Sequence, residues 1–529
     1  MKNYGNAQKH GAAGVGLILA VIFIIACNAA EPSRVLGNAE LLSATEPADS
    51  SSTLPPPDTP APAATAAALV NISAVATPTQ LPPAATPDST AEPPVSPSPL
   101  APVQVTETTI NLPTYPIKDF LVEQIDPVYN IPVYYFNRAD YEAAAPQPTP
   151  TDYTGVVLEN PYLRLTFLPE LGGRLYSAYL KTTDQEIFYH NPVVKPSRYG
   201  VLQPYEANWW LATGGMEWAY PTQEHGYRFG VAWSYEVTQT DSGATIVLSD
   251  TAPDRVGLTV RVTLPADKAL FTVEPTLVNN SPEAAPIQLW TNAALTLGSD
   301  SMSLNTQFVM PGQTITVHSR GEAGWSVPGE RQQAPWPQVG DTDLSRYNEW
   351  ANYLGFFVPN QEASFFGAYN PDTDLGLVRI PSAGPGSHKL FAFGRDFPDR
   401  SYTDDNSQYF EIWGGANAGF WPEDDLTVAA GDTLSWQETW WPLAQLGGLT
   451  WATERVALYL APTSETHTLT ALVSQPTVGT LEVTAGDAIL LSDPFSAEPA
   501  APKQWTIPTT DVPVTIQFKD EGDHTLLAY

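Results

Sequence analysis

The feature that most constrains the fold of this chain is a series of short runs in which apolar and polar residues alternate. Clear examples lie at 162–167, 256–264 and 270–278. Groups rich in Asp, Ser, Gly, Asn and Pro, such as 241–243 and 279–282, mark turns between such runs. No long stretch repeats its apolar residues with the 3.6-residue period of an amphipathic helix. The pattern therefore predicts an all-β protein with antiparallel sheets packed face to face.

The strand signals fall into two parts. A closing strand at 436–443 is followed by Gly447 and Gly448, and further short strand signals continue after this break. We therefore predict a large all-β unit over 114–450 and a small C-terminal β sandwich over 451–529. No repeat of about 20–50 residues is detectable, which argues against a solenoid or a propeller.

The first residues have the pattern of a bacterial export signal. Basic residues precede an apolar run over 11–26, which is shorter than the roughly 20 residues that span a bilayer. The run ends in Ile-Ile-Ala before Cys27, the single cysteine of the chain. This ending resembles a bacterial lipobox, in which the cysteine carries the lipid. We predict a signal peptide over 1–27 with Cys27 as the lipidated residue, and the alternative is an uncleaved anchor with an incidental cysteine.

Residues 28–113 are dominated by Pro, Ala, Thr and Ser and show no apolar periodicity. Such a composition buries too little apolar surface to offset the chain entropy that folding would remove. Its prolines favour extended, semi-stiff segments. We expect a disordered tether that holds the folded part away from a membrane, so that the protein is exported, lipid-anchored and faces the cell exterior or the periplasm.

The charge of the chain excludes some partners. The 57 acidic and 24 basic side chains give a net charge of −33. Nucleic acids are bound through clustered Lys and Arg, so we expect no nucleic-acid partner, whereas neutral sugars remain compatible. The sequence has no His/Cys spacing typical of zinc, no EF-hand loop, and no phosphate or dinucleotide loop. We therefore expect no metal and no cofactor.

Four stretches carry a resemblance to a known family, and they lie at 159–175, 214–229, 388–394 and 409–415. The first contains Gly-Gly-Arg, ending at Arg174, and the last contains Glu411. In this order they resemble the galactose-mutarotase-like (aldose epimerase) superfamily. They resemble more closely an uncharacterised subfamily often found with tetratricopeptide repeats. The resemblance implies a large antiparallel β supersandwich with a concave face that binds sugar.

The resemblance also implies which residues could act on a sugar. Aldose epimerases use a carboxylate that removes the anomeric hydroxyl proton and a histidine that protonates the ring oxygen. On this basis Glu411 corresponds to the general base, and His225, in a His-Gly pair, corresponds to one of two family histidines. The second histidine is expected in a Thr-Asn-His run, where this chain has Ala293. The chain thus departs from the family pattern, and enzymatic activity stays open.

Further residues are candidates for holding a sugar. Glu217 lies in an apolar stretch, and a buried carboxylate needs polar partners, so it is a candidate ligand of sugar hydroxyls. Arg174 could hold a carboxylate or a sugar hydroxyl, or anchor a strand end. Trp209, Trp210 and Trp413 could cover the apolar C–H face of a sugar ring. The alternative for each of these residues is a purely structural role.

Three hypotheses follow from the sequence. The leading one is a cell-surface lipoprotein with a β domain that binds a mono-, oligo- or polysaccharide. The second is a carbohydrate-active enzyme, either an aldose epimerase or a lyase or hydrolase, that uses Glu411 with His225. The third is a structural or adhesive envelope protein, which predicts that Trp209, Trp210 and Trp413 are dispersed in the core.

Overall fold

The structure is a computed structural model. It describes residues 102–125, 132–197, 206, 209–220, 230–251, 255–322, 324–394, 403–462 and 466–529. The predicted signal peptide, Cys27 and most of the predicted tether lie outside these residues.

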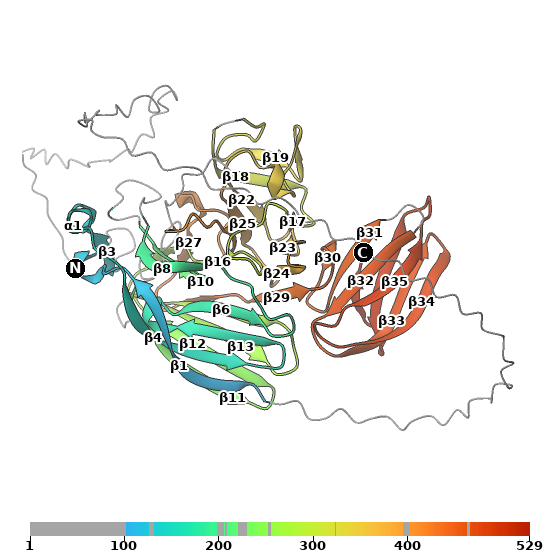
Figure 1. The fold of residues 1–529 in the computed structure, drawn as a ribbon, viewed down its shortest axis with the longest axis horizontal. Coiled ribbons are helices and arrows are strands. Elements are labelled where there is room, and N and C mark those ends of the chain that lie inside the picture. Colours follow the sequence, from blue (N-terminus) through green and yellow to red (C-terminus); the bar gives the residue numbers. More distant parts are fainter. Residues whose placement is uncertain are drawn as a thin grey trace, which may run out of the picture. The chain divides into compact units, whose positions relative to one another are not determined.

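The regular secondary structure of the described residues is almost entirely β-strand (Figure 1). One α-helix, α1 (Arg138–Ala144), and four short 3-10 turns are the helical elements of this part of the chain. None of its helices is long and apolar enough to cross a membrane. The all-β prediction is confirmed, because its expected strands at 162–167, 256–264 and 270–278 match three strands of the structure.

A 14-stranded sheet forms the larger layer of the main unit. Its strands, in spatial order, are β19 (Gln333–Pro335), β18 (Thr314–Arg320), β22 (Leu354–Pro359), β25 (Ser387–Ala392), β26 (Phe410–Gly415), β16 (Trp290–Leu295), β10 (Met216–Ala219), β6 (Arg174–Leu180), β5 (Leu163–Leu168), β4 (Thr149–Glu159), β1 (Gln104–Thr114), β8 (His190–Pro196) and β9 (Leu211–Gly214), with β7 (Gln185–Glu186) beside β6. We refer to this layer as the large sheet.

A nine-stranded sheet packs against the large sheet. Its strands are β11 (Ser234–Thr240), β12 (Gly243–Asp250), β13 (Val256–Pro265), β14 (Phe271–Asn279), β29 (Glu438–Ala444), β24 (Leu375–Pro381), β23 (Phe366–Asn370) and β17 (Gln307–Val309), with β28 (Thr433–Ser435) beside β14. Apolar side chains from both sheets, such as Leu165 and Leu258, form one buried cluster, which we call the main core. Three two-stranded sheets complete this part: β2 (Leu121–Ile125) with β3 (Pro132–Phe136), β15 (Ala285–Ile287) with β27 (Leu426–Val428), and β20 (Gln338–Val339) with β21 (Thr342–Asp343).

The C-terminal part forms two four-stranded sheets with a core of their own. One contains β30 (Trp451–Ala452), β31 (Val456–Pro462), β32 (Thr466–Val473) and β35 (Lys503–Pro508), and the other contains β34 (Ala488–Ala497), β33 (Thr477–Ala485), β36 (Val514–Asp520) and β37 (Thr525–Ala528). This arrangement agrees with the predicted small β sandwich. The domain limits of 114–450 and 451–529 remain predictions.

The ordered fold begins earlier than the sequence suggested. Residues 104–113, which the composition assigned to the tether, belong to β1, and this strand pairs with β4 along its whole length. Its Thr-rich sequence resembles the preceding tether, and few of its side chains are buried. The strand therefore depends on its pairing with β4, which is a long-range contact that composition does not reveal.

Candidate functional site

A concavity on the large sheet has a volume of about 340 Å³, counted up to its open mouth. Its lining residues come from strands that are distant in sequence and adjacent in the sheet, and they are Arg174, Tyr189, Asn191, Trp210, Leu211, Ala212, Thr213, Gly214, Gly215, Glu217, Asn292, Ala294, Tyr409 and Glu411. The strand order β26-β16-β10-β6 explains why the first and the last of these residues meet.

Strand alternation places the polar lining on one face of the large sheet and the main core on the other. On β10, Met216 belongs to the main core, whereas Glu217 lines the concavity. On β16, Ala293 lies in the main core, whereas Asn292 and its other neighbour Ala294 line the concavity. Glu217 pairs with Asn292 and Ala294 pairs with Glu411, so the three polar side chains share one face.

A buried ion pair forms the floor of the concavity. Nη2 of Arg174 donates to Oε2 of Glu217 over 2.8 Å, and the two residues are only 2% and 6% exposed. Nη1 of Arg174 donates to the carbonyl oxygen of Gly214 over 2.8 Å. Both terminal nitrogens of the guanidinium group are therefore engaged, which is the kind of compensation that a buried charge requires.

Two glycines make this geometry possible. Gly173, just before Arg174, has φ +66°, and a Cβ atom there would lie 2.9 Å from the ring of Trp233. Gly214 has φ +88°, and a Cβ atom there would lie 2.0 Å from the carbonyl oxygen of Tyr189. Both values are in the left-handed region, where glycine has no steric penalty. Gly173 and Gly214 thus let backbone and ring atoms approach closely at the concavity.

Three buried polar atoms of the lining have no hydrogen-bond partner among the described residues. They are Oδ1 of Asn292, Oγ1 of Thr213 and Nε of Arg174, and their residues are at most 3% exposed. Nδ2 of Asn292 donates to Oε1 of Glu217 over 3.2 Å, and this bond identifies the free amide atom as the acceptor. Unsatisfied buried groups cost roughly 1–3 kcal/mol each, and they are a common mark of a binding site.

Glu411 is held by a tryptophan from its own strand. Nε1 of Trp413 donates to Oε2 of Glu411 over 2.9 Å, and Glu411 is 5% exposed. The ring of Trp413 is fully buried beside Phe420 and below Nζ of Lys389, which lies 4.2 Å from the ring centroid. Trp413 therefore supports Glu411 from the same face of β26 and is not among the lining residues.

Two stacked tyrosines form part of the wall. The ring centroids of Tyr189 and Tyr409 are 4.7 Å apart, with an interplanar angle of 19°. The hydroxyl of Tyr189 donates to Oδ1 of Asn191 over 3.0 Å and lies 2.7 Å from Oγ of Ser407. Burial raises the pKa of Tyr189, so its hydroxyl is neutral at physiological pH.

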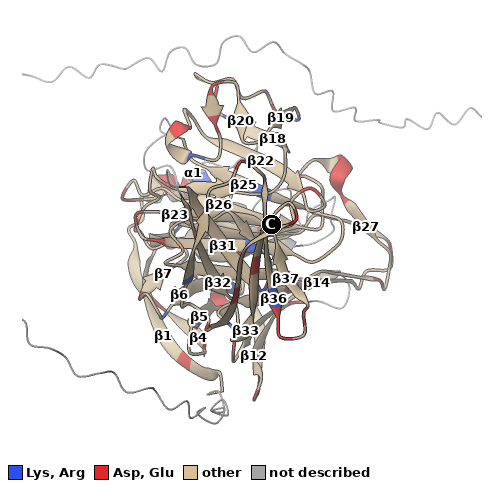
Figure 2. Cartoon of the chain, turned by 90° about the vertical axis from the view of Figure 1, so that its right-hand side faces the viewer, with Lys and Arg blue, Asp and Glu red and all other residues tan. Residues whose placement is uncertain are grey.

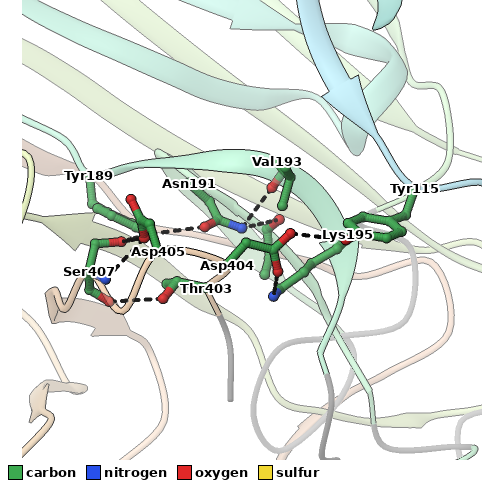
Figure 3. A network of polar contacts seen from close by, with 10 residues as sticks. Tyr115, Tyr189, Asn191, Val193, Lys195, Thr403, Asp404, Asp405 and Ser407 are labelled. Carbon is green, nitrogen blue, oxygen red and sulfur yellow. Dashed lines mark hydrogen bonds and ion pairs between the residues drawn. The ribbon is translucent and has the colours of Figure 1, made fainter. Parts of the chain in front are cut away.

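A polar network ties the segment ahead of β26 to β8 (Figure 3). Besides the bonds of Tyr189, Lys195 pairs with Oδ1 of Asp404, and the hydroxyl of Tyr115 donates to Oδ2 of Asp404 over 3.1 Å. Ser407 is fixed in turn by its backbone N–H and its hydroxyl, which both donate to Oδ1 of Asp405. The network holds the segment that carries Tyr409 and leads into Glu411.

The structure brings together four of the residues predicted from the sequence: Arg174, Glu217, Glu411 and Trp210. Trp209 is not among the lining residues; it lies in the apolar cluster that also holds Phe136 and Trp210, and it donates to the carbonyl oxygen of Tyr134. Trp413 is also a buried support. His225 lies outside the described residues.

The position aligned with the second family histidine, Ala293, faces the main core. The described lining contains no histidine. Sequence reasoning missed several lining residues: Tyr189, Asn191, Thr213, Asn292 and Tyr409. Asn292 and Tyr409 lay inside motifs that had been noted and could have been included, whereas Tyr189, Asn191 and Thr213 carried no sequence signal.

Comparisons with known proteins agree with this fold. A family model described as a domain of unknown function, DUF5107, matches residues 128–430, which is more than half of the chain. A TPR-domain containing protein from Parabacteroides distasonis ATCC 8503 matches with a TM-score of 0.51 and 21% identity, over 65% of this chain and 56% of that protein. The chain thus spans little more than half of that protein's length.

Less similar solved structures include two with sugar-related names. A galactose mutarotase-like protein from Clostridium acetobutylicum has a TM-score of 0.37 and 11% identity, over 55% of this chain and 96% of that one. The galactose 1-epimerase from Lactobacillus acidophilus NCFM has a TM-score of 0.38 and 12% identity, over 56% and 95%. The resemblance predicted from the sequence is confirmed by the match to the TPR-domain containing protein, and at 21% identity it concerns the fold alone.

Proposed function

Because the chain belongs to the family described as a domain of unknown function, DUF5107, we propose a function from the site itself: the protein is a cell-surface lipoprotein that binds carbohydrate in the concavity. The observation that carries this proposal is the convergence of Arg174, Glu217, Asn292 and Glu411 on one face of the large sheet. Carbohydrate sites combine a few fixed polar groups with aromatic walls, and Trp210 and the stacked tyrosines supply such walls.

The unsatisfied atoms of the lining support a ligand rich in hydroxyl groups. A ligand hydroxyl can donate a hydrogen bond to Oδ1 of Asn292 and can accept one from Nε of Arg174. The hydroxyl of Thr213 can either donate a hydrogen bond to a ligand hydroxyl or accept one from it. A sugar offers several hydroxyls on adjacent carbons, so one ring can meet several of these groups at once. An apolar ligand would leave all three groups unsatisfied.

The first test is a glycan array probed with the purified full chain, followed by calorimetry on each hit. We expect saturable binding that Asn292→Ala weakens by about 1–3 kcal/mol, because the variant removes a bonded polar group from the lining. Asn305→Ala is the matched control, since Asn305 lies in an exposed turn where it bonds Asp372. An array without any saturable ligand contradicts the proposal.

The cellular location is part of the proposal and rests on the sequence of the first residues. The apolar run ending at Cys27 supports lipidation, and the Pro-rich tether that follows supports a folded part held away from the membrane. Metabolic labelling with a fatty-acid analogue tests this directly. We expect label in the wild-type protein and none in Cys27→Ser, and equal labelling of both proteins contradicts lipidation at this residue.

One observation favours a second function, which is chemistry on the sugar. Two carboxylates, Glu217 and Glu411, line the same concavity, and paired carboxyl groups are a common arrangement for acid–base work on carbohydrates. Anomer interconversion of free aldoses, followed by NMR, tests it. An enzyme that uses Glu411 as its base loses turnover in Glu411→Gln while it keeps binding, and unchanged turnover in this variant eliminates that role.

The hypothesis of a purely structural protein predicted three core tryptophans. All three tryptophans do lie in buried apolar clusters, and Trp210 in addition lines the concavity. The rings of Trp209 and Trp413 are explained by local packing against Phe136 and Phe420. The polar concavity beside them has no role in a purely structural protein, and for this reason we favour a binding function.

A further inference from the structure

We infer that Glu217 sets the specificity of the concavity: by neutralising Arg174 it makes the site accept uncharged sugar units and exclude acidic ones, such as uronates. This inference rests on the proposed carbohydrate-binding function and adds a ligand class to it.

The charge of the lining opposes an acidic ligand. Arg174, Glu217 and Glu411 are the charged residues of the described lining, which gives one cation and two carboxylates. The cation is already paired with Glu217 at 2.8 Å in a site where both partners are almost fully buried. An incoming carboxylate would have to replace Glu217 or to lie near two like charges, and repulsion is strong where water is excluded.

The hydrogen-bonding pattern points in the same direction. Oδ1 of Asn292 is an acceptor, because Nδ2 of the same amide donates to Glu217. A hydroxyl group supplies the donor that this oxygen lacks, whereas an ionised carboxylate has no proton to donate. The binding groups left open by the fold therefore match a neutral polyol better than an anion.

Neighbouring cations are engaged in interactions of their own. Lys195, on β8, pairs with Asp404, to which Tyr115 also donates (Figure 3). Lys389 lies between the rings of Trp413 and Phe420, at 4.2 and 4.3 Å from their centroids.

Over the described part of the chain, acidic segments recur on loops and strand ends (Figure 2), in keeping with the net charge of −33. The surroundings thus add no attraction for an anion.

The test compares ligands that differ in one charge. The full chain is titrated with methyl glycosides of gluco, galacto and manno configuration, each as the neutral sugar, the uronic acid and the methyl ester of that acid. We expect the neutral sugar and the ester to bind at least about tenfold more tightly than the acid at pH 7. Acid and ester binding with equal affinity overturns the inference, although it leaves carbohydrate binding intact.

A variant and its matched control locate the effect. Glu217→Gln keeps the shape of the side chain and leaves the charge of Arg174 without its counter-ion. We expect the preference for ester over acid to fall by about tenfold or more in this variant. Glu411→Gln also removes one carboxylate but retains the pair of Arg174 with Glu217, so we expect a smaller change. An equal change in both variants overturns the role of Glu217 as the residue that neutralises Arg174.

The comparison in the wild-type chain stands without the variants, so a Glu217→Gln protein that does not fold leaves the inference testable. Failure of every sugar, neutral or acidic, to bind refutes the proposed function and the inference together. Binding of the acids alone refutes the inference and keeps the function. The three results are distinguishable in one set of titrations.

Discussion

A buried ion pair below the candidate site gives the most direct test of how the two sheets are held together. Arg379 on β24 and Glu438 on β29 are both fully buried, and Nη2 of Arg379 donates to Oε1 of Glu438 over 2.9 Å. Glu438 also accepts hydrogen bonds from Trp436, Trp440 and, on the large sheet, Thr291. The carboxylate therefore joins the nine-stranded sheet to β16, the strand that carries Asn292.

Replacing the cation isolates the carboxylate. Burial alone would raise the pKa of Glu438, but Arg379 and the hydrogen bonds outweigh burial and hold the pKa below its usual value. In Arg379→Met the carboxylate loses its counter-ion in a fully buried site, and breaking such a pair costs about 3–5 kcal/mol of unfolding free energy. The double variant Arg379→Met/Glu438→Gln removes both charges, so we expect it to regain a large part of this loss.

The pH dependence follows from the direction of each shift. In the wild type, the lowered pKa of Glu438 stabilises the fold above pH 4.5, and this stabilisation is lost as the pH falls through the folded-state pKa. In Arg379→Met, burial raises the pKa of Glu438 instead. The carboxyl then takes up a proton more readily in the folded state, so we expect the loss caused by the variant to be larger at pH 7 than at pH 5.

Chemical denaturation followed by tryptophan fluorescence measures these differences. The control is Arg346→Met, which breaks a pair with Asp343 whose arginine side chain is 60% exposed, and its expected effect is below about 1 kcal/mol. The reasoning is refuted by a loss below about 1 kcal/mol in Arg379→Met, or by a double variant that is no more stable than the single one.

Three further predictions concern the site and its support. Gly214→Ala forces a Cβ atom to 2.0 Å from the carbonyl oxygen of Tyr189, so we expect loss of sugar binding in titrations together with a lower thermal midpoint. Trp413→Phe removes the N–H donor to Glu411, and calorimetry should show affinity weakened by about 1 kcal/mol with the fold retained in circular dichroism. Burial, followed by the charge of Arg379, holds the pKa of His388 well below 6.5; denaturation at several pH values should therefore show stability falling below pH 6.5 by up to about 1.4 kcal/mol per pH unit from this residue.

Much of the fold was predictable because strand alternation records which face of each strand is buried. The run at 256–264 illustrates this, since β13 alternates along the predicted pattern and packs on the main core. The strand β1 was missed because its residues share the composition of the tether, and its stability comes from β4. Apolar periodicity indicates which residues of a strand are buried. It gives no signal where a strand at the surface is held mainly by backbone pairing.

The site was predictable only in part, for a related reason. Glu217 stood out because a charged residue in apolar surroundings needs a partner, and the structure supplies Arg174 of the Gly-Gly-Arg stretch as that partner. The roles of the tryptophans were harder to predict, because a ring that covers a sugar and a ring that fills a core have the same composition signal. Trp210 lines the concavity and Trp413 does not, and composition alone does not distinguish them.

The close approach of the two sheets below Glu411 leads to a last prediction. Gly414 lies on β26, three residues after Glu411, and a Cβ atom at this position would lie 2.1 Å from Nε of Arg379. Arg379 is fixed on its other side by the bond to Glu438, so it cannot move away without breaking the buried pair. In Gly414→Ala we therefore expect β26 to shift, with a loss of about 1–3 kcal/mol in stability, as for other overpacked cores.

Glu411 and Gly414 both lie on β26, and the guanidinium group of Arg379 packs against Gly414. A shift of β26 in Gly414→Ala should therefore weaken sugar binding and also lower the stability. Gly329→Ala is the control, since nothing lies within 4 Å of the added methyl group there. Titration and denaturation of the two variants separate the possibilities. A Gly414→Ala protein with full stability and reduced binding would mean that the sheets tolerate the methyl group by moving Glu411 alone. Unchanged stability and unchanged binding would show that Arg379 is free to move and that the buried pair is not coupled to the site.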